Sequence, residues 1–300
     1  MLSINRVLCA VDFSEFSLDA LRHGVVLARW YGAELRLLHV YEPAATLLPV
    51  KGPPGDLPLS QPVNVEELAG EVRQFCAPVL EPVAKNVEVV LKEGKAAKEI
   101  AREAERWPAD LLILGTHGRS GFERLFLGSV TEKVLRSTRV PLLTIPPTVR
   151  QPGSPLFKTI LCPVEFSGAS TRALEYALSL AKEADARLIV LHVLEDTLGE
   201  AGAETLGHLS LSEYHQHVEQ EALKRLTAAI PEDARVWAKP DERVSKGRAY
   251  REILKTVEEE RVELVVMGVN GRGAIDRFVF GSTTHRVIRD AACPVLTLHG

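Results

Sequence analysis

The sequence predicts an α/β protein of two tandem doubly wound domains, each a five-stranded parallel sheet with helices on both faces. Two observations predict this fold. Short apolar segments alternate with amphipathic ones along the 300-residue chain, and such alternation forms parallel sheets through right-handed crossovers. The second half also repeats the first: GTHGRSGFERLFLGSV at 115–130 returns as GVNGRGAIDRFVFGST at 268–283.

The repeat extends over the whole chain. Three further segments return 153 residues later: RVLCAVDFS (6–14) as TILCPVEFS (159–167), ELRLLHV (34–40) as RLIVLHV (187–193), and RVPLLTI (139–145) as ACPVLTL (292–298). A constant offset indicates a duplicated domain rather than an array of short repeats. We therefore predict one domain at 1–148 and a second at 155–300, joined through the Pro- and Gly-containing stretch TIPPTVRQPGSPL.

The elements of the first half follow from apolar periodicity. Continuous apolar runs predict buried parallel strands, and apolar residues at helical spacing predict helices, the first of which stops at Gly32. The predicted order is strand 7–11, helix 14–32, strand 34–40, helix 64–85, strand 87–94, helix 96–107, strand 110–115, helix 129–138 and strand 141–146, with a Pro-rich loop at 43–62. In the second half the third strand, within 239–247, is polar and contains Pro240.

Composition and charge exclude several classes of protein. The chain is 46% hydrophobic and 25% charged, which is an ordinary globular composition. Its net charge of -4 gives no positive field for nucleic acid. The sequence contains no apolar run of about 18 residues for a membrane span, and MLSINRVLCAVD at the start predicts a strand rather than a signal peptide. We expect a cytoplasmic protein that binds neither nucleic acid nor membrane.

The sequence contains no catalytic or metal-binding pattern that we recognise. The four cysteines form no CxxC pair, and two lie inside apolar runs, so they are predicted to be small buried residues. His208, His215 and His217 gather in one region, but no Cys or carboxylate completes a metal-binding spacing. Neither half carries a Walker A lysine, a G-x-S-x-G elbow or an H-E-x-x-H motif. We therefore assign no catalytic residue and no metal site.

The repeated glycine stretch lies where a ligand is expected. DLLILG ends a predicted strand at Gly115, and doubly wound sheets bind ligands beyond the carboxyl ends of their strands. Gly115 and Gly118 let the backbone turn tightly and approach a ligand. Gly128 and Ser129 then begin a helix, whose N-terminus attracts phosphate; Ser129 and Glu132 fit a capping box. The glycines of one copy could serve only as turns, but two copies with equal spacing favour a phosphate cradle.

The pattern G-x2-G-x9-G-[ST], together with V-D-x-S after the first strand, resembles the universal stress protein family. The resemblance covers nearly all 300 residues and both halves. It implies a tandem member with an adenine nucleotide alpha-hydrolase-like, Rossmann-like fold. In that family this glycine pattern marks the branch that binds ATP, so the resemblance implies two ATP molecules per chain. Apart from the resemblance, the carboxylate of Asp12 or Glu165 could hold Mg²⁺ or Mn²⁺ through a phosphate, which would permit slow hydrolysis.

The resemblance also assigns positions around the nucleotide. Asp12 would contact the nucleoside, with Ala10 beside it, and the Val40 backbone would hold adenine. The ribose and phosphates would be bordered by Leu114, Gly115, His117, Gly118, Arg119, Gly128, Ser129 and Val130. The matching positions in the second half are Pro163, Glu165, Val193, Met267, Gly268, Asn270, Gly271, Arg272, Gly281, Ser282 and Thr283. Glu165 lengthens the acidic side chain by one methylene, and Asn270 cannot titrate as His117 can.

Three neighbouring features have alternative interpretations. Asp12 could cap the following helix, but Ser14 and Ser17 are better placed to do so, which favours ligand contact for Asp12. Strand alternation points His39 and His192 away from the neighbouring valines, so we interpret both as structural. Arg124 and Arg277 are further candidates, beside Arg119 and Arg272, to neutralise phosphate.

Three functions remain open from the sequence. The first is a nucleotide-responsive regulatory or stress-resistance module, in which ATP stabilises a conformation that an unidentified protein partner recognises. The second is a slow ATP-hydrolysing or nucleotidyl-transferring enzyme of the same fold. The third is a purely structural tandem domain. The resemblance further implies that the domains pair within the chain through their last strands, leaving either a monomer or a further homodimer.

Overall fold

The computed structural model describes residues 3–42, 63–80, 87–118, 127–149, 157–195, 211–269 and 281–299. The first half contains β1 (Arg6–Ala10), α1 (Glu15–Tyr31), β2 (Glu34–Tyr41), α2 (Val65–Leu80), β3 (Val87–Glu93), α3 (Ala96–Arg106), β4 (Leu111–Gly115), α4 (Ser129–Ser137) and β5 (Leu142–Ile145). The second half contains β6 (Thr159–Pro163), α5 (Gly168–Ala184), β7 (Arg187–Leu194), α6 (Leu211–Ala229), α7 (Glu232–Ala238), β8 (Asp241–Lys246), α8 (Ala249–Glu259), β9 (Leu264–Gly268), α9 (Ser282–Asp290) and β10 (Val295–Leu298).

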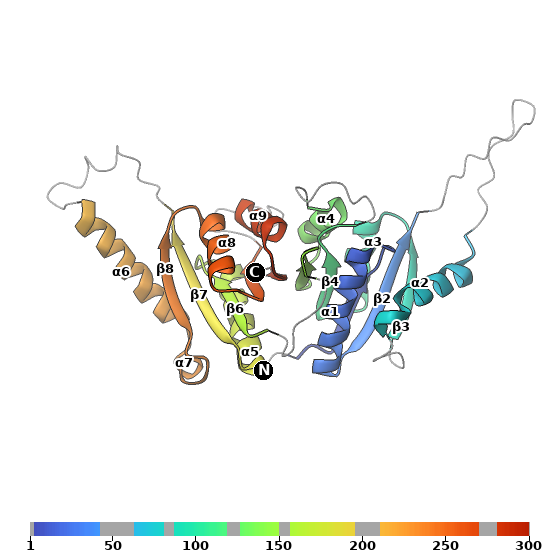
Figure 1. The fold of residues 1–300 in the computed structure, drawn as a ribbon, viewed down its shortest axis with the longest axis horizontal. Helices are drawn as coiled ribbons and strands as arrows, with labels where there is room; N and C mark the ends of the chain where they lie inside the picture. The colour runs from blue at the N-terminus through green and yellow to red at the C-terminus, as the bar shows by residue number, and fades with distance from the viewer. Residues whose placement is uncertain are drawn as a thin grey trace, which may run out of the picture.

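The strands form one sheet in the order β3-β2-β1-β4-β5-β10-β9-β6-β7-β8. All pairs within each half are parallel. Figure 1 shows the two halves side by side, meeting at the middle of the molecule. The predicted fold class, two doubly wound domains with five parallel strands each, is confirmed.

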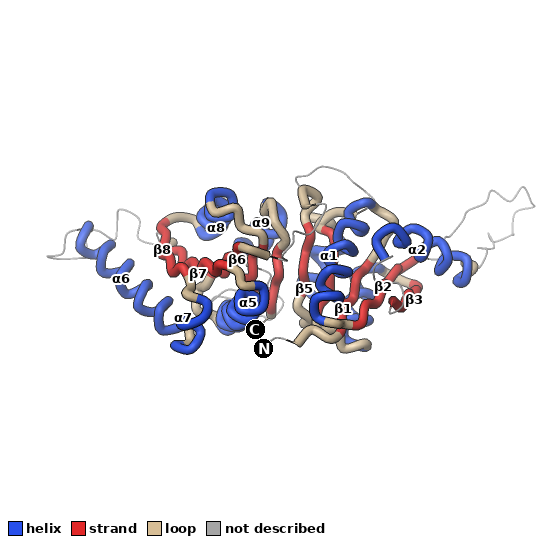
Figure 2. Tube along the Cα trace, turned by 60° about the horizontal axis from the view of Figure 1, so that its bottom comes forward, coloured by secondary structure: helices blue, strands red, loops and turns tan. Residues whose placement is uncertain are grey.

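Helices cover both faces of the sheet, as Figure 2 shows. One face packs its apolar side chains against α1, α2, α5, α6 and α7, and the other face packs against α3, α4, α8 and α9. The central strands are apolar on both sides because they are buried on both sides, which is why VLCAV and LLILG read as continuous apolar runs.

Local sequence signals place the ends of the first helix of each half. The Ser14 side chain accepts a hydrogen bond from the Ser17 N–H at the start of α1, and Ser167 caps α5 in the same way. Helix α1 ends at Gly32, whose φ of 65° lies in the left-handed region that glycine adopts at little cost.

The third strand of the second half is confirmed as β8, despite its polar sequence, because Pro240 lies just before its first residue and its missing N–H costs the ladder nothing. Two other segments differ from the sequence-based prediction or lie partly outside the described residues. The short helix α7 was not predicted, since seven residues are too few for a periodic signal. Helix α2 ends at Leu80 in the described chain, and the predicted loop 43–62 lies outside it.

The two halves meet through their last strands. Strands β5 and β10 pair antiparallel, with Leu143 opposite Leu296. The hydroxyl of Thr144 donates to the Val295 carbonyl, and the hydroxyl of Thr297 donates to the Leu142 carbonyl, each at 3.1 Å. These two side-chain bonds add to the backbone bonds between the four-residue strands β5 and β10. Because the two strands pair, neither presents an open sheet edge at the centre of the molecule.

A second contact between the halves joins α1 to α5. The Tyr31 hydroxyl donates a hydrogen bond to the Glu183 carboxylate at 2.6 Å. Burial, together with this acidic neighbour, raises the pKa of Tyr31, so the phenol keeps its proton and remains a donor at neutral pH. The contact therefore links the helices on one face of the junction.

None of the described helices combines the length and the apolar character needed to cross a lipid bilayer.

We predict that Tyr31→Phe destabilises the junction. The change removes the hydrogen bond to a charged group, worth about 1.5 kcal/mol, which corresponds to a fall in melting temperature of about 3–6 °C for a chain of this size. Thermal unfolding followed by circular dichroism measures it. Tyr176→Phe is the matched control, because in the described part of the chain no hydrogen bond of the Tyr176 hydroxyl is found. Equal melting temperatures for both variants would contradict the prediction.

Candidate functional site

A pocket of about 660 Å³ opens at the carboxyl ends of β1, β2 and β4. Its volume is typical of small-ligand sites, and its position is the one that doubly wound sheets use for ligands. All ten predicted site residues of the first half that the structure describes line this pocket: Ala10, Asp12, Val40, Leu114, Gly115, His117, Gly118, Gly128, Ser129 and Val130.

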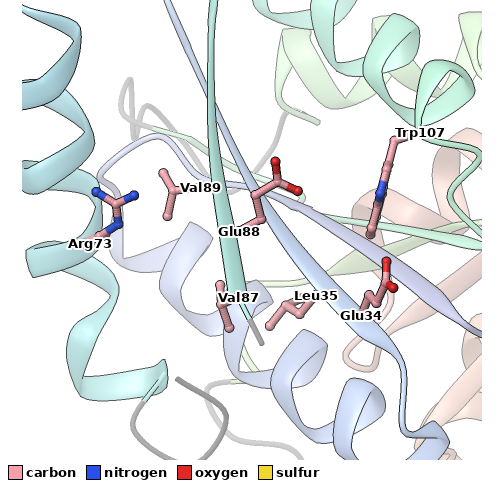
Figure 3. Close-up of a pocket in the computed structure, with 7 residues that line it drawn as sticks. All are labelled: Glu34, Leu35, Arg73, Val87, Glu88, Val89 and Trp107. Atoms are coloured by element: carbon pink, nitrogen blue, oxygen red, sulfur yellow. The ribbon is translucent and has the colours of Figure 1, made fainter. Parts of the chain in front are cut away.

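A second hollow, of about 410 Å³, lies at the amino ends of β2 and β3 (Figure 3). Its carboxylate Glu88 is already paired with Arg36, at 2.6 Å. The Arg36 guanidinium in turn lies 4.2 Å from the centre of the Trp107 ring. Because these groups satisfy one another and the hollow lies at the wrong ends of the strands, the pocket around Asp12 is the candidate site.

The turn after β1 holds the acidic side chain of the pocket. One oxygen of Asp12, Oδ1, accepts from the Ser14 hydroxyl at 2.5 Å and from the Ser14 N–H at 3.1 Å. The other oxygen, Oδ2, lies toward Gly118, where an added Cβ would approach it to 2.6 Å. Asp12 therefore lies beside the glycine turn, in a cradle that a larger residue at 118 would fill.

The connection from β4 to α4 is closed by hydrogen bonds at its two ends. The Gly128 N–H donates to the Thr116 carbonyl, and the Thr131 hydroxyl donates to the Gly115 carbonyl, each at 2.8 Å. These bonds bring the start of α4 back onto the end of β4. A Cβ on Gly128 would lie 2.9 Å from the Thr116 carbonyl oxygen, so this close approach needs glycine.

The N-terminus of α4 faces the pocket, which is lined by Gly128, Ser129, Val130 and Thr131. The predicted capping box is wrong. Gly128 is the N-cap, Ser129 is the first helical residue, and no side chain caps the helix; Glu132 pairs with Arg136 at 2.9 Å instead. Because Gly128 has no side chain, no cap side chain accepts hydrogen bonds from the first N–H groups of α4. These N–H groups are therefore available to bind an anion.

His117 lines the pocket and carries a titratable ring. Its Nδ1 lies 3.0 Å from the Thr116 hydroxyl, whereas Nε2 is buried and has no hydrogen-bond partner in the described part of the chain. Burial lowers the pKa of His117 below its ordinary value, so the ring is neutral at pH 7. A buried nitrogen of this kind is costly unless a ligand or solvent satisfies it.

The second half repeats the geometry with its own residues. Gly281 donates to the Val269 carbonyl at 3.2 Å and Thr284 to the Gly268 carbonyl at 3.1 Å, as Gly128 and Thr131 do in the first half. The Ser167 hydroxyl holds Glu165 at 3.1 Å. The remaining described positions follow the equivalent strand and helix ends: Pro163 ends β6, Val193 lies near the end of β7, Met267 and Gly268 end β9, and Ser282 and Thr283 begin α9.

Some predicted residues lie outside the described part of the chain. They are the four positions Arg119, Asn270, Gly271 and Arg272, together with Arg124 and Arg277. Their assignment remains a prediction from the sequence.

Other pocket residues were missed by the sequence reasoning: Val11, Ser17, Leu38, Glu42, Ala96, Ile100 and Thr131. The repeat carries a signal for all seven, because each has an identical residue 153 positions later, as Glu42 has in Glu195 and Thr131 in Thr284. Within the described residues no cluster of His, Cys, Asp and Glu is able to hold a metal ion by itself.

Comparison with known proteins gives a consistent result. A model of the universal stress protein family matches residues 3–146 and again residues 156–299. Universal stress protein MJ0531 of Methanocaldococcus jannaschii is 33% identical over 148 residues, covering 49% of this chain and 84% of that protein. Universal stress protein Slr1230 of Synechocystis is 23% identical over 312 residues, covering 98% of this chain and 99% of that protein.

Among solved structures, a universal stress protein from Archaeoglobus fulgidus matches 99% of both chains with a TM-score of 0.64 and 24% identity. This likeness extends to the complete two-domain fold.

We predict that the glycine turn tolerates alanine unequally. Gly128→Ala places a Cβ 2.9 Å from a backbone carbonyl and should cost about 1–3 kcal/mol of stability. Gly281→Ala, where the distance is 3.2 Å, should cost less. Gly70→Ala in α2 is the control: nothing lies within 4 Å, so it should stabilise by up to about 1 kcal/mol. Urea unfolding measures all three, and the reverse order would show that the turn is looser than described.

Proposed function

Because the chain belongs to the universal stress protein family, we propose that each domain binds one ATP molecule and that the chain acts as a nucleotide-responsive regulatory module in stress resistance. The observation that carries this proposal is the pocket at the ends of β1, β2 and β4, in which an acidic side chain, a glycine turn and an uncapped helix N-terminus line one cavity.

The groups in the pocket divide by chemistry into two sets. The N–H groups at the start of α4 and the buried Nε2 of His117 suit phosphate oxygens. The Asp12 carboxylate suits ribose hydroxyls, which can donate to it, or a divalent cation carried on the phosphates. Apolar residues such as Leu38, Val40 and Ile100 suit the flat face of a base. A nucleoside triphosphate matches all three requirements.

Mg²⁺ or Mn²⁺ would enter with the nucleotide. A single carboxylate, Asp12 or Glu165, together with phosphate oxygens and water, is a coordination shell that Mg²⁺ commonly accepts. The absence of a protein cluster for metal among the described residues fits this arrangement. In this proposal the cation supplies charge neutralisation to the phosphates.

The assembly follows from the same proposal. Pairing of β5 with β10 supports the expectation that one chain joins its own two domains through their last strands. A further homodimer would then need another surface, because those two strands are interior to the sheet.

We predict that ATP binds with a stoichiometry of two, and that Ser129→Glu or Ser282→Glu reduces it to one. A carboxylate in the first turn repels phosphate, while it stabilises the helix through the dipole, so the loss of binding is separated from loss of folding. Calorimetric titration of nucleotide-free protein with ATP and Mg²⁺ measures it. The double variant should bind none; two sites in that variant, or none in the natural chain, would refute the proposal.

We also predict that ATP raises the pKa of His117. Without ligand, burial holds this pKa low, whereas the phosphate negative charge favours the imidazolium. Binding then takes up a proton, and affinity at the first site should increase as pH falls from the pKa of the bound ring toward the lowered pKa of the free ring. NMR titration of the His117 ring with and without ATP measures the shift. Titration of ATP itself affects both sites, so His117→Asn, which copies Asn270, is the control.

A further inference from the structure

The ladder between β1 and β2 stops where the candidate pocket begins. The Val11 N–H still donates to the Leu38 carbonyl, at 2.9 Å. In a parallel ladder the next bond would run from the Val40 N–H to the Val11 carbonyl. That bond is not formed in the described structure, in which the register of the pair ends at Ala10 and Leu38.

A histidine side chain takes the carbonyl that the ladder leaves. Nδ1 of His39 lies 2.8 Å from the Val11 oxygen. Because a carbonyl only accepts, Nδ1 carries the proton and donates. His39 is only 6% exposed, so this bond is shielded from water. The Val11 carbonyl is therefore satisfied without the Val40 N–H.

The turn that follows keeps the chain away from the ladder. Phe13 has a φ of 62°, a left-handed conformation that is uncommon for a bulky residue and persists only where its surroundings hold it. Its ring packs edge-on against the His39 imidazole, with centroids 4.8 Å apart. His39 thus contacts the residues on both sides of Asp12, one through a hydrogen bond and one through its ring.

The second half builds the same unit. The Val164 N–H donates to the Leu191 carbonyl at 2.8 Å, and Nδ1 of His192 lies 2.6 Å from the Val164 oxygen. Phe166 also has a φ of 62°, and its ring lies 4.7 Å from that of His192. The unit persists although the acid between its two contacts changes from Asp12 to Glu165, which indicates that it serves the site rather than one particular side chain.

The peptide of Val40 is directed at the pocket by this arrangement. Successive residues of a strand point their N–H and C=O groups to opposite neighbours. The Tyr41 carbonyl accepts from Gly94 on the β3 side, and the Leu38 carbonyl accepts from Val11 on the β1 side. The groups of Val40 therefore point to the β1 side, beyond the last residue of β1, and Val40 lines the pocket.

We infer that His39 and His192 are positioning residues that keep the Val40 and Val193 peptides available to a ligand, by occupying the Val11 and Val164 carbonyls that would otherwise bind them. The inference rests on the proposed nucleotide sites. It explains why the peptides of Val40 and Val193 are able to recognise a base. The N–H of such a peptide can donate to a base, and its C=O can accept from the same base. This pair suits a base edge that carries an acceptor beside a donor, as adenine does with N1 and its exocyclic amine.

Amide hydrogen exchange tests the inference without any ligand. In the natural chain the Val40 N–H should exchange about tenfold or more faster than the Val11 N–H, which is hydrogen-bonded. In His39→Leu the Val11 carbonyl loses its donor, and the Val40 N–H should become about tenfold slower. Loss of a merely structural histidine would do the opposite, because destabilisation accelerates exchange. NMR-resolved exchange reads both amides.

A conservative variant and the other half complete the experiment. His39→Asn, whose amide nitrogen can replace Nδ1, should keep fast exchange at Val40. His192→Leu and the Val193 N–H repeat the test if His39→Leu does not fold. Slow exchange of Val40 in the natural chain, or unchanged or faster exchange in the folded leucine variants, would overturn the inference.

ATP titration of the same variants separates the two proposals. His39→Leu should weaken binding at the first site about tenfold and leave the second unchanged, whereas His39→Asn should bind as the natural chain does. Failure of the natural chain to bind ATP would refute the proposed function alone, because the exchange result does not depend on nucleotide. Slowed exchange at Val40 with undiminished ATP affinity would overturn the role of its peptide in binding.

Discussion

Parallel strands leave peptide groups without partners wherever one strand ends before its neighbour. Strand β1 ends at Ala10, whereas β2 continues to Tyr41. The mismatch leaves the Val11 carbonyl without a partner in the ladder. Because Val11 is buried, this carbonyl needs a donor from elsewhere in the protein, and the His39 side chain provides it. The turn at Phe13, the direction of Asp12 and the N-cap of α1 at Ser14 all follow within four residues. A single buried hydrogen bond thus connects the end of the sheet to the groups of the pocket.

The other wall of the pocket is built from the close approach of β4 and α4. Hydrogen bonds from Gly128 and Thr131 fold the helix start back onto the strand end. Because glycine is the N-cap, the helix begins without a side chain over its first N–H groups. An acidic residue on one wall and a positive dipole end on the other give the cavity two chemically different ends, which is what a molecule with both hydroxyls and phosphates requires.

Much of this could be predicted from the sequence. The fold class followed from alternating segments and from the repeat, and the described site residues of the first half all line one pocket. Two errors were local. The S-x-x-E pattern at Ser129 predicted that Ser129 caps the helix, but the motif carries no information about where β4 and the following loop place the chain. The helix begins one residue earlier than the motif assumes, with Gly128 as its N-cap. Helix α7 was too short to produce a period.

The sequence by itself determined the duplicated domain, the order of its elements and the positions of the glycine turns, because periodicity, capping and backbone freedom depend on neighbours along the chain. Only the tertiary structure decided which groups meet across the sheet. The bond from His39 to Val11, the contact of Tyr31 with Glu183, and the presence of Ile100 beside Asp12 in one pocket join residues far apart in sequence. Such contacts depend on strand register and helix placement, and no local pattern of residues contains that information.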